Sequence, residues 1–201
     1  MRNLQDLVTE AFAEAVANGF SEHPDKKTAM VLVIGELSEL VEADRKGHTA
    51  YRNLDVLAQV EKESVIQVQE RIMSWKDKRF KPFFEDNIKD TLEDKLADTV
   101  IRICNYLGSL DYKMEFSEPF NPKTAQAVQE LMQHSTLPQN VMDFMETICL
   151  YVYENLPESH LESVVHMLFA FADVMNVSLM WHIEAKIRYN RLRGYKYGKK
   201  Y

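Results

Sequence analysis

The sequence predicts an all-α fold, built as a bundle of helices. Apolar residues recur at three- and four-residue spacing along nearly the whole chain, and no strand-like alternation persists. Glycine and proline, which interrupt helices, number only 6 each among 201 residues. At this length we expect one domain with a substantial hydrophobic core.

The expected helices lie between breaks that the sequence itself marks. A turn at residues 23–25 ends the first helix, Gly47 ends the second and Gly108 ends the fourth. Pro157 separates the last two, because proline cannot continue a helix that precedes it. The apolar spacing places the helices at about 3–18, 26–45, 50–73, 88–107, 138–155 and 158–190.

Two segments interrupt this pattern. Residues 117–123 (SEPFNPK) form the clearest linker, because they hold two prolines and little apolar character. Residues 75–87 (WKDKRFKPFFEDN) are too aromatic and too basic for an ordinary linker, so this break is a candidate lid or base-binding loop.

A weak internal repeat organises the helices. Residues 93–111 align with 161–179, and the helices that precede these two segments also align. This predicts a single domain over 1–201 that contains two stacked helical hairpins, at about 26–111 and 138–190. The alternative is chance similarity between amphipathic helices.

Charge is strongly segregated along the chain. The last sixteen residues, 186–201 (KIRYNRLRGYKYGKKY), carry seven basic residues and no acidic residue. The whole chain has a net charge of −7, so the remainder carries about −14. This separation favours a polyanionic partner for the C-terminal segment.

The rest of the sequence indicates the cellular compartment and argues against a zinc site. No apolar run reaches the ~18 residues of a membrane span, and the acid-containing N-terminus does not resemble a signal peptide. We therefore expect a cytoplasmic protein that does not interact with a membrane. Cys104 and Cys149 lie in apolar helical stretches, which is typical of reduced core thiols rather than of a zinc site.

Glu36 and Glu39 are candidate Mg²⁺ ligands. On a helix, Glu36 shares its face with the apolar core stripe, and Glu39 lies one turn further on. An ionised carboxylate on such a face is costly unless it is paired or bound to a cation. Mg²⁺ prefers oxygen ligands and would relieve the repulsion between the two acids. The alternative is that Glu36 pairs with a basic side chain while Glu39 is solvated.

Asp94 and Asp98 form a second candidate pair of Mg²⁺ ligands. They lie one turn apart on the 88–107 helix, beside its apolar stripe. The alternative is an ion pair between Asp98 and Arg102 on a solvent-exposed face, since these residues have i, i+4 spacing.

Residues of the basic segment are candidate nucleotide contacts. Lys186, Asn190 and Arg193 share one helix face, and Tyr195 and Lys196 follow a break at Gly194. Lysine offers a point charge, arginine a planar fork for phosphate oxygens, and asparagine a hydrogen-bonding amide. The alternatives are a solubilising tail or a nucleic-acid-binding segment.

Three segments together resemble a known family. GELSELVEADRKG (35–47), KDTLEDKLADTVIRI (89–103) and KIRYNRLRGYKYGKKY (186–201) are similar to the MazG-like all-α nucleoside triphosphate pyrophosphatases, a superfamily that includes the dimeric dUTPases. The resemblance implies Mg²⁺-dependent hydrolysis of a (deoxy)nucleoside triphosphate to a monophosphate and pyrophosphate. It also implies a homodimer.

By this resemblance, Glu36, Glu39 and Asp98 fall on the Mg²⁺ ligands of the family. Lys186, Asn190 and Arg193 fall on its nucleotide-contacting residues. Glu39 is our candidate for the catalytic acid that also accepts the proton of the attacking water.

One position departs from the family pattern. Lys95 stands where the family has a second glutamate three residues before the aspartate, and a protonated lysine cannot bind Mg²⁺. Two poses are expected for Lys95. It either pairs with Asp98 and weakens the site, or points outward and leaves Asp94 to replace the missing ligand.

The sequence thus leaves three functional hypotheses. The first is Mg²⁺-dependent pyrophosphohydrolysis. The second is a catalytically weakened nucleotide-binding or regulatory protein of the same fold. The third, which we consider less favoured, is a nucleic-acid-binding helical module that uses the basic C-terminal segment alone.

Overall fold

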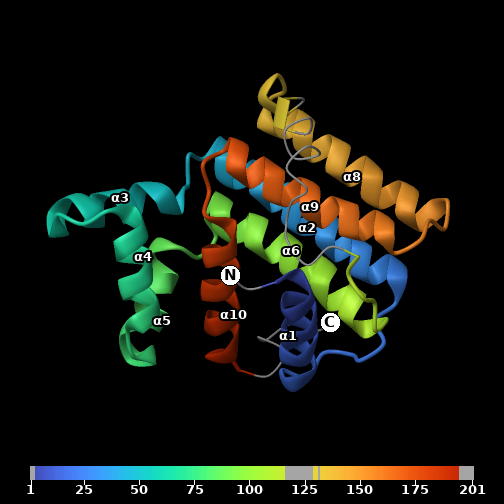
Figure 1. Cartoon of the computed structure of the whole chain (residues 1–201), viewed down its shortest axis with the longest axis horizontal. Helices are drawn as coiled ribbons and strands as arrows, with labels where there is room; N and C mark the ends of the chain where they lie inside the picture. Colours follow the sequence, from blue (N-terminus) through green and yellow to red (C-terminus); the bar gives the residue numbers. More distant parts are fainter. Residues whose placement is uncertain (1–2, 116–128, 131, 195–201) are drawn as a thin grey trace.

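The computed structural model describes residues 3–115, 129–130 and 132–194, and every regular element in these ranges is a helix. The predicted all-α class is therefore confirmed for this part of the chain. The expected linker at 117–123 lies outside it. The helices, labelled as in Figure 1, are α1 (Leu4–Ala17), α2 (Lys26–Arg45), α3 (Ala50–Glu61), α4 (Val65–Ser74), α5 (Asp77–Asn87), α6 (Leu92–Ser109), α8 (Leu137–Tyr153), α9 (Ser159–Val174) and α10 (Leu179–Arg191).

Helix α2 has the bounds expected from the sequence because both of its ends carry strong local signals. The side chain of Asp25 accepts a hydrogen bond from the backbone N–H of Thr28 at 2.8 Å, which caps the first turn. Gly47 follows the helix with a φ of +63°, a left-handed conformation that glycine adopts without strain.

The segment expected to be helical at 50–73 is helical except at residues 62–64, and this break, which was not predicted from the sequence, divides it into α3 and α4. Lys62 adopts a left-handed conformation with a φ of 58°, which ends α3. Ser64 and Gln67 then form a reciprocal capping box that starts α4. The Ser-x-x-Gln pattern was present in the sequence, but the continuous helical spacing of the apolar residues concealed it.

Two other boundaries also differ from expectation. Most of the expected break at 75–87 is helix α5, whose apolar face is buried. The expected helix at 158–190 divides into α9 and α10, which are bent by 113° relative to each other. Asn176 makes this turn with a φ of 57°, a conformation that asparagine tolerates better than most residues. Within the described ranges no single helix is long and apolar enough to cross a membrane, although the bent pair α9 and α10 reaches that length and composition together.

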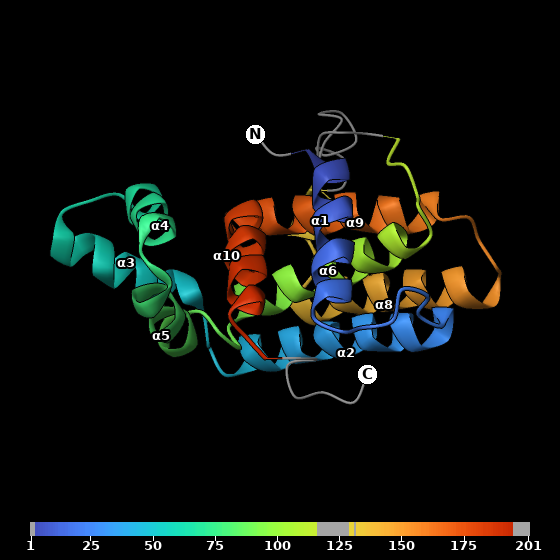
Figure 2. The ribbon, with the colours of Figure 1, turned by 90° about the horizontal axis from the view of Figure 1, so that it is seen from below.

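The larger part of the molecule is a bundle around α6. Helix α2 packs against α6 and α8, α9 packs against α6 and α8, and α1 and α10 both cross α6 (Figures 1 and 2). The core of this bundle is aliphatic and aromatic and is fully buried, with members such as Leu37, Leu96, Val100, Phe144, Ile148 and Leu168. Burial of this surface supplies the main driving force for folding.

Residues 50–87, comprising α3, α4 and α5, form a smaller unit that we call the arm. In Figures 1 and 2 the arm lies to one side of the bundle, next to α10. It has a hydrophobic cluster of its own, in which Leu54, Ile72, Phe80 and Phe84 are buried. The segment 75–87 is therefore part of a packed helical unit.

Helix α10 joins the arm to the bundle through its two faces. Ile183 and Ile187 belong to the bundle core, whereas Ala185 and Tyr189 belong to the cluster of the arm. The ring of Tyr189 stacks on Phe84, with 4.4 Å between ring centroids. The position of the arm therefore depends on the position of α10.

Polar contacts strengthen the attachment of the arm to α10. The indole N–H of Trp181 donates to the backbone carbonyl of Gln69 at 3.0 Å. The guanidinium of Arg188 donates to the carbonyl of Met73 at 2.9 Å, to that of Trp75, and to the carboxylate of Asp77 at 2.8 Å. The bonds from Arg188 to the carbonyls of Met73 and Trp75 satisfy backbone groups at the C-terminal end of α4, which the helix itself leaves unpaired.

Substitutions at Gly108 and Gly35 test how closely α1 approaches α6. A Cβ at Gly108 on α6 would lie 2.5 Å from the Cβ of Phe12 and 3.0 Å from the carbonyl oxygen of Val8, whereas a Cβ at Gly35 on α2 has no such neighbour within 4 Å. We expect Gly108→Ala to lower the free energy of unfolding by ~1–3 kcal/mol through overpacking. Gly35→Ala should raise it by ~0.5–1 kcal/mol through helix propensity. Chemical denaturation measures both, and equal stabilisation would contradict the close crossing of α1 and α6.

Candidate functional site

Glu36 lies in the bundle interior between α2 and α6, as its place on the apolar stripe predicted. Its Oε1 accepts hydrogen bonds from Nε and Nη2 of Arg102, at 2.8 and 2.7 Å. Its Oε2 lies 3.6 Å from Nζ of Lys95 and is buried with no hydrogen-bond partner in the described part of the chain. Glu36 therefore pairs with basic side chains, which was the alternative to metal binding.

Lys95 is the residue that brings the first two predicted ligands together. Its ammonium group contacts carboxylate oxygens of Glu39 and Glu36 from α2 and, at 3.2 Å, Asp90 from the turn before α6. Burial lowers the pKa of Lys95, but the hydrogen bond with Glu39 and the charge of Glu36 outweigh it and raise this pKa above its ordinary value. The side chain is a fixed cation.

Neither expected pose of Lys95 occurs. Lys95 does not contact Asp98 as an ion-pair partner, because Asp98 is bound to Lys186, and it does not point outward. The expectation was limited to partners one turn away on the same helix. It missed that α2 presents Glu36 and Glu39 to Lys95 across the helix interface.

Asp94 and Asp98 form a second group around Lys186 of α10. Nζ of Lys186 lies 2.8 Å from both oxygens of Asp94 and 2.7 Å from Oδ2 of Asp98. The backbone N–H of Asp90 donates to Oδ2 of Asp94 at 2.9 Å. These contacts place Asp94 in the interface between α6 and α10. It does not lie beside Glu36 and Glu39, where a replacement metal ligand would be needed.

The charges of this second group are strongly perturbed by their surroundings. Burial raises the pKa of the Asp94 carboxyl to about 6, against the opposing charge of Lys186 and together with the like charge of Asp98. Burial lowers the pKa of Lys186, but the carboxylates of Asp98 and Asp94 outweigh it and raise this pKa above its ordinary value. The alternative of a surface ion pair between Asp98 and Arg102 does not occur either, because Arg102 pairs with Glu36 and Asp98 pairs with Lys186.

Asn190 and Arg193 lie together at the end of α10, as the helix-face prediction implied. Nη1 of Arg193 donates to Oδ1 of Asn190 at 3.5 Å. Lys186, in contrast, is occupied by two aspartates and is not presented to a ligand. Tyr195 and Lys196 lie outside the described residues.

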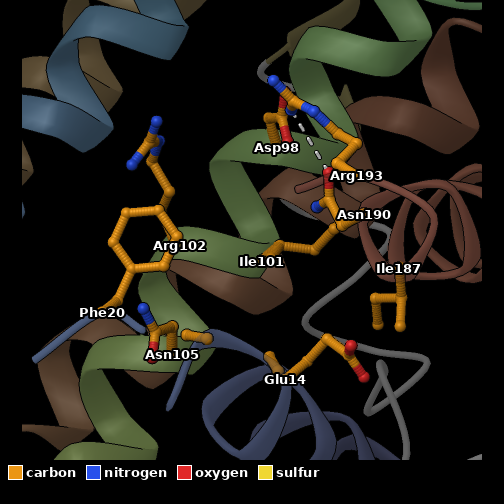
Figure 3. A pocket seen from close by; sticks show the side chains of 11 residues that line it. Glu14, Phe20, Asp98, Ile101, Arg102, Asn105, Ile187, Asn190 and Arg193 are labelled. Carbon is orange, nitrogen blue, oxygen red and sulfur yellow. Dashed lines mark hydrogen bonds between the residues drawn. The ribbon is translucent and has the colours of Figure 1, made fainter. Parts of the chain in front are cut away.

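Asn190 and Arg193 line a cavity of about 90 Å³ between α1, α6 and α10 (Figure 3). Phe20, Ile101 and Ile187 provide apolar walls, and polar groups come from both sides of the cavity. Its full lining is Ala11, Glu14, Ala15, Phe20, Asp98, Ile101, Arg102, Asn105, Ile187, Asn190 and Arg193. We call this the α1–α6–α10 cavity.

Two residues at the site were not identified from the sequence. Asn105 lines the cavity, and its Oδ1 is buried without a hydrogen-bond partner among the described residues. Its place seven residues after Asp98, on the same helix face, was a readable signal. Asp90 binds Lys95 from a turn in which it adopts a φ of 61°, and helical spacing carries no signal for that contact.

The carboxylates do not fit a divalent cation as they lie. Glu36 and Glu39 hold the ammonium of Lys95, and Asp94 and Asp98 hold that of Lys186. No three acidic, histidine or cysteine side chains in the ranges 3–115, 129–130 and 132–194 are arranged to share a metal ion. Five carboxylates and three basic side chains thus form two ion-pair groups, which the hydrogen bond from the backbone N–H of Asp90 to Asp94 joins into one network.

Comparison of the chain with family models, with curated proteins and with solved structures found no match in any of the three.

The pKa of Asp94 gives a direct test of this network. Its folded-state pKa of about 6 lies above the value of 3.8 for an unperturbed aspartate, so protonation favours the folded state. The stability that Asp94 contributes is fully present below about pH 3.8 and is lost as the pH rises through about 6. Carbon-13 NMR of the aspartate carboxyl groups should show Asp94 titrating near pH 6.

The Lys186→Met variant sharpens this test. The Asp94 midpoint should rise further, because burial and the charge of Asp98 both raise it and the lysine no longer opposes them. Lys46→Met, which removes an exposed partner of Glu42, is the matched control and should leave Asp94 unchanged. A wild-type midpoint at or below 3.8 would show that Asp94 is not held in a dry interface.

Proposed function

We propose that this chain is a nucleotide-binding protein of the MazG-like all-α class, with two stacked helical hairpins, in which Lys95 suppresses pyrophosphohydrolysis. The observation that carries the proposal is the contact of the Lys95 ammonium with both Glu36 and Glu39. In the family that the sequence resembles, these two glutamates would bind Mg²⁺. A lysine that cannot leave its protonated state at neutral pH holds them instead.

The α1–α6–α10 cavity supports the nucleotide-binding part of the proposal. It combines apolar walls with two amides, Asn105 and Asn190, and two guanidinium groups, Arg102 and Arg193. Amides hydrogen-bond base and sugar edges, and guanidinium forks suit phosphate oxygens. Arg102 uses Nε and Nη2 for Glu36, which leaves Nη1 for a ligand.

The size of the cavity indicates how a nucleotide would lie. At about 90 Å³ the cavity has room for part of a base or sugar but not for a whole triphosphate. The phosphates would extend beyond it on the side of Arg193.

Mg²⁺-dependent hydrolysis of a triphosphate to a monophosphate and pyrophosphate is the second candidate function. It is favoured by the approach of Glu36 and Glu39 to one point from α2, and by the unpartnered Oε2 of Glu36. It requires Lys95 to leave this point, after which Glu39 would be available as the proton acceptor. A homodimer remains an expectation of the same family resemblance, and a cytoplasmic location remains an expectation from the sequence pattern.

A substitution at Lys95 separates the two functions. Lys95→Glu should raise Mg²⁺ affinity and the rate of pyrophosphate release tenfold or more, equivalent to ~1.4 kcal/mol, because it replaces a cation with the missing carboxylate. Calorimetry with Mg²⁺ and a pyrophosphate-release assay across ribo- and deoxynucleoside triphosphates measure both. Lys95→Gln is the matched control, since it removes the charge and adds no strong metal ligand.

The outcomes are distinct. Triphosphate binding by the wild type without pyrophosphate release supports suppression by Lys95. Efficient wild-type turnover that Lys95→Glu does not increase would reject suppression and leave the hydrolase function. Absence of both triphosphate binding and turnover would reject both functions.

Arg193 tests the placement of the phosphates. Arg193→Lys should weaken triphosphate binding by about fivefold to tenfold, because a point charge does not replace a planar fork at a bidentate site. Arg45→Lys is the matched control, because Arg45 is exposed at the end of α2 and forms its ion pair with the neighbouring Glu42. If the Arg193 variant and the wild type bind the triphosphate with equal affinity, the phosphates do not contact Arg193.

A further inference from the structure

A second and larger hollow lies between the arm and the bundle, on the far side of the buried acids from the α1–α6–α10 cavity. It has a volume of about 580 Å³ and is bordered by α3 and α4, by the start of α6 and by the α9–α10 turn. Figures 1 and 2 show the arm beside α10 at this place. We call it the arm cleft, and it is lined by Thr49, Tyr51, Leu54, Ser64, Val65, Ile66, Gln69, Leu92, Glu93, Met175, Asn176, Val177, Ser178 and His182.

The volume and lining of the arm cleft are those of a small-molecule site. Cavities of roughly 300–1,000 Å³ with mainly apolar walls and a few polar groups are typical of such sites. Leu54, Val65, Leu92 and Val177 provide apolar walls. Tyr51 adds an aromatic ring that is about half exposed.

His182 is the imidazole that lines this cleft. The residue is 3% exposed, and its Nδ1 is buried without a hydrogen-bond partner in the described part of the chain. Burial lowers the pKa of the ring to about 3, so the imidazole is neutral at physiological pH. An unpaired buried polar group costs about 1–3 kcal/mol.

The charges of the arm cleft exclude a phosphate-bearing ligand. Among the described residues that line it there is no lysine or arginine. Glu93, the one carboxylate among those described lining residues, accepts hydrogen bonds from the backbone N–H groups of Ala50 and Tyr51 at 2.7 and 2.9 Å. That carboxylate is therefore committed to the N-terminus of α3, where the helix dipole favours a negative charge. The cleft is suited to an uncharged ligand.

We propose that the arm cleft binds a neutral, planar heteroaromatic compound of nucleobase or nucleoside size, with its hydrogen-bonding edge toward His182. The apolar walls and the ring of Tyr51 suit a flat aromatic body, and neutral imidazole can donate or accept one hydrogen bond. The site is separate from the α1–α6–α10 cavity, and the proposal does not depend on the proposed function.

The first experiment compares neutral and charged probes on the wild-type protein. Adenine, adenosine, uridine and adenosine monophosphate are titrated by isothermal calorimetry. At least one neutral probe should bind saturably at a site blocked by the variant described next. The monophosphate should bind that site at least tenfold more weakly than adenosine, because no cation there compensates its charge. Absence of saturable binding by every neutral probe would overturn the proposal.

Ile66 and Val60 locate the binding site. Ile66 lines the cleft and is 64% exposed, whereas Val60 is 74% exposed on the same arm and does not line it. Ile66→Trp should block the cleft and weaken binding of the neutral probe tenfold or more, whereas Val60→Trp should leave the affinity unchanged. Equal affinities for Ile66→Trp and the wild type would place the probe elsewhere and overturn the proposal.

His182→Phe tests the hydrogen bond while keeping a planar ring. It should weaken binding of the neutral probe about fivefold or more, and an unchanged affinity would reject the role of His182. Ile66→Trp should leave triphosphate binding intact, because that ligand lies in the other cavity. Failure of this proposal, with triphosphate binding retained, is thereby distinguished from failure of the proposed function.

Discussion

The ammonium group of Lys186 lies between the carboxylates of Asp94 and Asp98, in an interface from which water is almost excluded. Removing one partner of a buried ion pair commonly costs 3–5 kcal/mol, because the other charge is left without compensation. An apolar packing of the same helices could be as stable. We therefore infer that the main effect of this group is to fix the position of α10 along α6. The arm depends on the same contact, because Trp181, Arg188 and Tyr189 attach it to α10.

Both cavities are also lined by residues of α6 and α10, so their shapes depend on the interface between these two helices, which we call the seam. The α1–α6–α10 cavity lies toward the C-terminal ends of these helices, where Arg102 and Arg193 line it. The arm cleft lies toward their N-terminal ends, where Leu92 and His182 line it. The lysine and its two aspartates separate the two. One buried charge group thus lies between a hollow lined by guanidinium groups and a hollow with no lysine or arginine among its described lining residues, and the two ligand proposals rest on this difference.

The sequence predicted the class of fold and the helices with strong local ends, but not the turns made by unusual backbone conformations. Asp25 and Gly47 bracket α2 with signals that act within a few residues. Lys62 and Asn176 both adopt a positive φ. Lysine has no preference for this conformation, so its presence in the sequence did not indicate a turn. Such turns are imposed by packing of the flanking helices, so helical spacing continued through them.

The sequence indicated acidic and basic residues that the structure brings together, but it did not predict which of them form ion pairs with one another. Glu36, Glu39, Asp94, Asp98 and Lys186 all gather between α2, α6 and α10. Their partners could not be found from spacing along one helix, which suggested Asp98 for Arg102. Tertiary packing brings Glu36 within hydrogen-bonding distance of Arg102. A charge-assisted hydrogen bond to a guanidinium stabilises a buried carboxylate more than it stabilises an exposed carboxylate. Interhelical charge pairing requires the relative rotation of two helices, which a single sequence does not contain.

The two lysines of the network differ in how freely they can change partners. Lys186 is held by the fully buried side chain of Asp94 and by Asp98, which is 17% exposed. Lys95 is held by Glu36, but its other partners, Glu39 and Asp90, are 59% and 56% exposed. Water can replace the exposed partners of Lys95 at small cost, whereas it cannot enter the interface around Lys186. A ligand that competes for these carboxylates would therefore displace Lys95 more readily than Lys186, which keeps α10 in place.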